Sequence, residues 1–160
     1  MNGTGFSIAL ACGGLGLVLS AAPARQGWLA LALLAVMALA TGKLPFALAL
    51  QPMALKALGA GTIVTAALAY LGSRAAPLLG LAAANLGFWL GVLLQSGETS
   101  APEFALGAGC VLLFFPARFL HERGMQVATY VVASWIMTAG FINLVFALLQ
   151  PSGPVMDHML

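Results

Sequence analysis

The chain has 160 residues, of which 62% are hydrophobic and 6% are charged, and its net charge is +2 at pH 7. A water-soluble surface needs about 25% charged residues, which this chain cannot supply with six Lys and Arg and four Asp and Glu. The composition excludes a soluble globular enzyme, a disordered tail and a disulfide-framed secreted module, and it predicts an integral membrane protein.

The charged residues divide the chain into apolar intervals, five of which reach the length that a spanning helix needs, about 17 to 20 residues. These intervals are 1–24, 26–42, 57–73, 75–97 and 124–156. Within them we expect helices at 6–22, 27–44, 54–72, 77–95 and 126–149. No interval shows the period-two alternation of a membrane barrel strand. The pattern predicts an all-α, polytopic transmembrane bundle that forms a single domain over residues 1–160.

The first interval could instead be read as a cleaved leader. It lacks the basic residues that open a signal peptide, so we expect 6–22 to be the first spanning helix.

Residues 44–55 are apolar but short, and they contain Pro45 and Pro52. Proline removes a backbone donor and clashes with the preceding turn, so one of these two prolines is expected to mark a bend between the second and third helices. The alternative is one long, tilted helix from 27 to 50 that turns at Gln51.

Residues 104–117 form an uncharged run of only 14 residues, but Phe119 and Leu120 extend its apolar character. Arg118 can extend its guanidinium group to the lipid headgroups while its stem stays in the apolar region. We therefore expect a sixth helix at 103–120, and a five-helix bundle is the alternative.

The number of helices decides the orientation, because loops facing the cytoplasm carry the excess of Lys and Arg. With six helices, one end of the bundle holds Arg25, Arg74, Arg118 and Arg123. The other end holds Lys43, Lys56, Glu98, Glu103 and Asp157. Both termini then lie outside the cytoplasm, whereas five helices put the N-terminus inside. The C-terminal tail is extracytoplasmic in both versions, and we expect a bacterial-type inner membrane.

Small residues spaced four apart predict where helices approach closely, since lipid supplies no hydrophobic drive for helices to associate. Three such ridges are Ala83, Gly87 and Gly91; Ala57, Gly61, Thr65 and Ala69; and Cys12, Gly16 and Ser20. We expect them to pack inside the bundle. The alternative is a homo-oligomer that forms through Ala83, Gly87 and Gly91.

The sequence contains no recognisable catalytic, nucleotide-binding or metal-binding motif. Cys12 and Cys110 lie in different apolar helices and are expected to act as small hydrophobic residues. Six helices put His121 and His158 at opposite membrane faces, so they cannot share a haem or a metal. We predict no catalytic residue, no metal, no cofactor and no nucleic acid partner.

Two lysines near the proline bend are candidate functional residues. Lys43 comes late in the second helix and Lys56 early in the third, so both are expected at the same depth. They could form a basic vestibule that attracts an anionic substrate or a lipid headgroup. The alternative is that both lysines simply extend to the headgroups beside the acidic residues at that end.

Four uncharged polar residues are candidates for a substrate path across the membrane: Asn85, Asn143, Thr65 and Thr138. An Asn in hydrocarbon needs a partner from another group, because its amide carries two donors and an acceptor. The alternative is a direct bond between Asn85 and Asn143. Thr can return its hydroxyl to its own helix and needs no function.

Three functions fit these observations. The first is a small transporter or channel component, on the evidence of the intramembrane Asn and Thr residues and the lysine pair. The second is an accessory, non-catalytic subunit of a larger respiratory or transport complex, because helices that are apolar all round need partners. The third is a membrane enzyme acting on a lipid or quinone, for which only Glu98, Glu103, His121 and Glu122 offer chemistry.

Overall fold

The computed structural model describes residues 3–97 and 100–149, and the side chains of residues 3 and 46–48 are left aside. Glu98, Asp157 and His158, which entered the predictions above, lie outside the described residues.

Helices account for all the regular structure in this part of the chain, which contains no strand. The α-helices are α1 Gly3–Ser20, α2 Ala24–Thr41, α3 Gln51–Leu68, α4 Ala76–Ser96, α5 Ala101–Gly109, α6 Phe114–Glu122 and α7 Gln126–Leu149. Three 3-10 helices connect them: η1 Pro45–Leu50, η2 Ala69–Ala75 and η3 Cys110–Leu113.

Within the described residues, four helical runs are long and apolar enough to cross a membrane: Ala24–Thr41, Gln51–Ser96, Ala101–Glu122 and Gln126–Leu149. The chain is therefore all-helical and has the features of a multi-pass membrane protein, as its composition predicted. α1 adds a shorter apolar helix. Helical structure covers every range predicted from the sequence, with ends shifted by a few residues, but the predicted count of six spanning helices is not confirmed.

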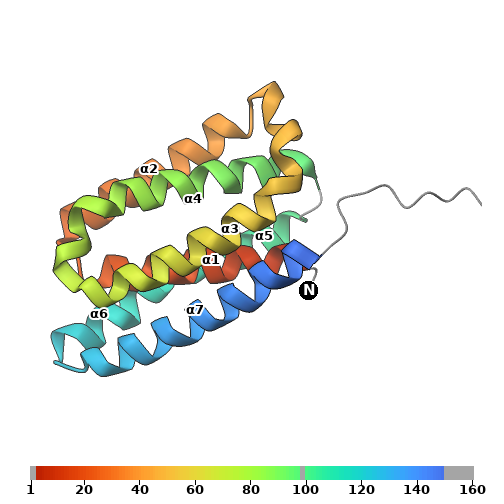
Figure 1. Cartoon of the computed structure of the whole chain (residues 1–160). Helices are drawn as coiled ribbons and strands as arrows, with labels where there is room; N and C mark the ends of the chain where they lie inside the picture. The colour runs from red at the N-terminus through yellow and green to blue at the C-terminus, as the bar shows by residue number, and fades with distance from the viewer. Residues whose placement is uncertain (1–2, 98–99, 150–160) are drawn as a thin grey trace, which may run out of the picture.

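The run from Gln51 to Ser96 turns back on itself at Gly72, which has φ 55° and ψ −131°. This backbone conformation favours glycine, because a Cβ atom would be strained there. The turn makes α3 and α4 neighbouring antiparallel helices (Figure 1).

The single long helix from 27 to 50, considered above as an alternative, is wrong. α2 ends at Thr41, and the Gly42 N–H donates to the Ala38 carbonyl at 3.0 Å. Pro45 then opens η1, and Pro52 lies in the first turn of α3. Both prolines occupy helix starts, where the missing N–H has no intrahelical partner to lose.

The doubtful segment 103–120 is helical throughout, but η3 interrupts its α-helical geometry. Pro116 explains the interruption, because it cannot donate to the Leu112 carbonyl and its ring crowds that carbonyl. The preceding turn tightens into a 3-10 helix, as is common near such breaks.

α1 occupies the middle of the bundle (Figure 1), and every residue from Ala11 to Ser20 is buried. It packs against α3, α5, η3, α6 and α7, and it also contacts α4. The enclosing helices fill its surroundings with apolar side chains such as Leu58, Leu86 and Leu90.

α2 is an outer helix that packs mainly on α4. A Cβ atom at Gly87 would lie 2.5 Å from the Leu34 carbonyl oxygen, and one at Gly91 would lie 2.5 Å from the Ala38 carbonyl oxygen. The ridge on α4 thus packs inside the chain, as expected. A second copy could reach Ala83, Gly87 and Gly91 only if α2 moved away.

The two ends of the bundle differ in charge. The connections α1–α2, α3–α4 and α6–α7 lie together at one end, at the left of Figure 1. These connections and the adjoining helix ends contain Arg25, Arg74, Arg118 and Arg123. Lys43, Lys56 and Glu103 belong to the segments at the opposite end.

We predict that Gly91→Ala destabilises the protein by about 1–3 kcal/mol, because the added methyl group must push α2 off α4. The measurement is the free energy of unfolding in detergent. Gly80→Ala, also in α4, is the matched control, because its Cβ would meet only Leu33 at 3.9 Å. Equal effects of the two substitutions would contradict the close α2–α4 contact.

Candidate functional site

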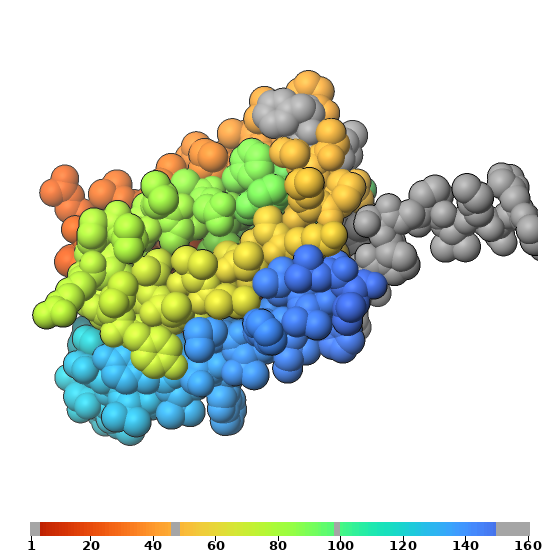
Figure 2. Space-filling view, viewed as in Figure 1, coloured from red at the N-terminus to blue at the C-terminus, as the bar shows by residue number. Residues whose placement is uncertain are grey.

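A groove runs between α3 and α4, on the face shown in Figure 2. It consists of two adjoining cavities of about 190 and 300 Å³ that share Val64, Ala82 and Asn85. The remaining lining residues are Ala57, Ala60, Gly61, Thr65, Leu68, Leu78, Leu81 and Trp89. Small side chains dominate the part near Gly61, which is why the helices leave a hollow there.

Asn85 gives this apolar groove its polar character. It is an exposed residue near the middle of α4, and its Oδ1 accepts a hydrogen bond from Trp89 Nε1 at 3.3 Å. Its Nδ2 lies over Gly61, 3.3 Å from where a Cβ atom would be. Among the described residues, nothing accepts a hydrogen bond from this amide nitrogen. In hydrocarbon, an unpaired polar group of this kind costs several kcal/mol.

Thr65 lines the same groove from the α3 side. Its Oγ1 donates to the Gly61 carbonyl at 2.6 Å, so its donor is satisfied within the helix. The hydroxyl oxygen keeps acceptor capacity. The antiparallel pairing of α3 and α4 therefore brings together two of the four residues predicted for a substrate path.

The other two candidates lie elsewhere, on α7. Asn143 Nδ2 donates to Ser7 Oγ at 2.8 Å, which links α7 to the central helix α1. Thr138 is exposed and donates to the Ser134 carbonyl at 2.9 Å. The alternative considered from the sequence, a direct hydrogen bond between Asn85 and Asn143, is wrong, because each Asn has a different partner.

The lysine pair remains a prediction. Lys43 is exposed in the turn after α2, and Lys56 is half-buried in the second turn of α3. Glu103, the described acidic residue at this end, forms a capping box with Ser100 at the start of α5. The one ion pair found among the described residues joins Arg118 and Glu122 at 2.9 Å, at the opposite end of the bundle.

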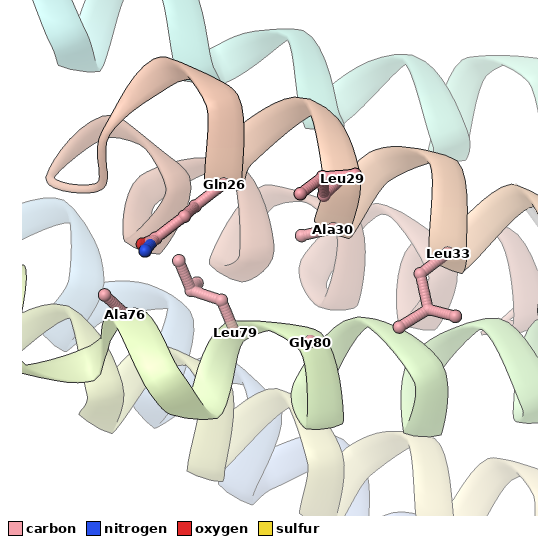
Figure 3. Close-up of a pocket in the computed structure, with 7 residues that line it drawn as sticks. All are labelled: Gln26, Leu29, Ala30, Leu33, Ala76, Leu79 and Gly80. Carbon is pink, nitrogen blue, oxygen red and sulfur yellow. The ribbon is translucent and has the colours of Figure 1, made fainter.

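Another cavity, of about 200 Å³, lies between α2 and α4 near the arginine-rich end. Gln26 extends from α2 toward Ala76 and Leu79 of α4 (Figure 3). Gln26 was not among the sequence-based candidates. Gln26 directly follows Arg25 and was therefore expected outside the hydrocarbon interior. The candidate polar residues were chosen from inside that interior.

Sequence reasoning also missed two partners that simple spacing could have revealed. Trp89 follows Asn85 by four residues, which puts both on one helix face. Ser100 and Glu103 have the Ser-x-x-Glu spacing of a capping box. By contrast, no local signal pairs Ser7 with Asn143, which are 136 residues apart.

Metal-binding side chains do not converge in the part of the chain that the structure describes, where no three of His, Cys, Asp and Glu form a group. Cys12 is buried and Cys110 is half-buried, and both are free thiols.

We predict a coupling energy of about 0.6–2 kcal/mol between Ser7 and Asn143, as for other hydrogen bonds between membrane helices. A double-mutant cycle with Ser7→Ala and Asn143→Leu, followed by unfolding in detergent, measures it. As a control, a second cycle that combines substitutions of Thr138 and Ser7 should show no coupling energy. Additive effects of Ser7→Ala and Asn143→Leu would contradict the link between α1 and α7.

No family model matches the chain, and comparisons with curated proteins and with solved structures give no significant match.

Proposed function

We propose that this protein is a six-span protein of a bacterial-type inner membrane and acts as an accessory, non-catalytic subunit of a larger membrane complex. The observation that carries the proposal is the filled centre of the bundle. α1 occupies the axis with buried apolar residues such as Ile8, Leu15 and Leu19. The interior of the bundle is thus filled by packed side chains. Contact with a ligand or partner is therefore expected at the outer surface.

The outer surface supports association with other membrane proteins. Large apolar side chains are exposed on several helices, including Leu81 (76% exposed) on α4 and Trp135 (73% exposed) on α7. Lipid alone can cover such a surface. The amide nitrogen of Asn85 is different, because lipid tails offer it no acceptor and only a polar partner can form a hydrogen bond with it.

Six spans follow if α1 crosses the membrane and if α5, η3 and α6 act as one crossing. The common location of three arginine-containing connections supports this count, and their excess of arginine supports a cytoplasmic location for that end. Both chain termini then belong to the extracytoplasmic side.

Transport is a second candidate function, favoured by the groove that Asn85 and Thr65 share. Its path would run along the α3–α4 surface instead of through the bundle axis. The enzyme hypothesis gains no comparable support, because Glu122 is paired with Arg118 and Glu103 caps α5.

The topology prediction concerns alkaline phosphatase joined by a linker to the N-terminal side of Met1. We expect this fusion to be active, because six spans put the N-terminus outside the cytoplasm. A fluorescent protein inserted after Gly124 should mature, because that turn faces the cytoplasm in the six-span arrangement. A cytoplasmic N-terminus would eliminate six spans.

The accessory role predicts that the chain, extracted from its native membrane in mild detergent, migrates with other subunits in a fixed stoichiometry. Recovery of this chain without other subunits would contradict that role.

The transport candidate is tested with the purified protein in KCl-loaded vesicles. A K⁺ or Cl⁻ leak above that of protein-free vesicles, lost in Asn85→Leu, would favour the transport candidate instead.

A further inference from the structure

We infer that two copies of this chain associate side by side through the α3–α4 groove, with the Asn85 amides of the two copies hydrogen bonded to each other. The groove is defined here by Ala57, Ala60, Gly61, Val64, Ala82 and Asn85. This inference goes beyond the proposed function and does not depend on it, since a pair of copies can exist inside or outside a larger complex.

The first step of the argument is the unsatisfied amide. Asn85 is the tenth of the 21 residues of α4, so it lies near mid-depth if this helix spans the membrane. Water and headgroups are remote at that depth, and the amide N–H groups have no acceptor within the described chain. Asn143 does not share this condition, because Ser7 accepts its hydrogen bond.

The second step is self-complementarity. An Asn side chain has two N–H donors and a carbonyl oxygen with two lone pairs. Trp89 uses one lone pair of Asn85 Oδ1, which leaves the other for a second donor. Each copy can therefore donate one bond to its partner and accept one in return.

The third step is depth. Two copies inserted in the same orientation hold Asn85 at the same level of the bilayer. A two-fold axis along the membrane normal then brings the two amides together, because a symmetric contact pairs the same surface patch on both copies. An unrelated partner helix would need an acceptor at this depth, and nothing in the chain specifies one.

The fourth step is shape. The groove floor has small residues, which allow the backbones of two membrane proteins to approach closely. Among the residues that line the groove, Val64 (59% exposed) on α3 and Leu81 on α4 are large and exposed. In a symmetric pair, these protruding side chains of one copy can occupy the hollow of the other. The glycine ridge of α4 cannot serve this purpose, because α2 covers it.

The test measures association in lipid vesicles by single-molecule subunit counting at increasing dilution of the protein. We expect wild-type dimers, and we expect Asn85→Leu to weaken association by about tenfold, which corresponds to about 1.4 kcal/mol. Asn85→Gln should restore association, because it keeps both donors and the acceptor. Asn143→Leu is the matched control, which should lower stability and leave association unchanged.

Cysteine crosslinking locates the interface. In a background with Cys12→Ala and Cys110→Ala, a cysteine at Ala82 should crosslink between copies, whereas a cysteine at Trp135 on α7 should not. Monomers at every protein density, association that Asn85→Leu leaves unchanged, or faster crosslinking at position 135 would each overturn the inference. The unfolding transition of Asn85→Leu verifies that the variant is folded, as expected for an exposed position.

Discussion

The structure depends on close backbone contact between helices at glycine positions. Lipid does not drive apolar helices together, so their association relies on dispersion contacts that need near approach. A Cβ atom at Gly16 would lie 2.8 Å from the Val111 carbonyl oxygen, and one at Gly107 would lie 2.8 Å from Ile8 Cγ2. These contacts hold α1 against the segment from α5 to α6. The equivalent contacts at Gly87 and Gly91 hold α2 on α4.

Several buried hydroxyl groups are satisfied within their own helices, whereas the buried Gln95 Oε1 and Thr129 Oγ1 have no partner among the described residues. Ser20 Oγ donates to the Leu17 carbonyl, Thr62 Oγ1 donates to the Leu58 carbonyl, and Thr65 Oγ1 donates to the Gly61 carbonyl. Among the described residues, side-chain hydrogen bonds from Asn143 to Ser7 Oγ and from the Tyr70 hydroxyl to the Tyr130 carbonyl cross between segments. Asn85 stands apart from all of these, since its donors point into an open groove. That contrast underlies the proposal that two copies associate through the α3–α4 face.

The arginine-rich end has a different chemistry. Arg118 pairs with Glu122, and its guanidinium carbon lies 5.8 Å from the centroid of the Phe114 ring. Arg123 lies closer to an aromatic ring, 4.2 Å from the centroid of Phe119. These contacts keep the cations at the edge of the apolar region, where their stems can remain in contact with hydrocarbon.

The amino-acid sequence by itself determined the fold class, the helices and the bend near Pro45 and Pro52. These features depend on composition, on the length of uncharged runs and on the missing N–H of proline, all of which are local. The sequence also nominated Asn85 and Asn143 as polar residues that need partners. Only the tertiary structure decided which helix lies in the centre, because apolarity all round does not distinguish an enclosed helix from one covered by lipid. It likewise decided that Asn143 is satisfied by Ser7 while Asn85 keeps its donors, because hydrogen bonding between distant segments depends on how the helices pack.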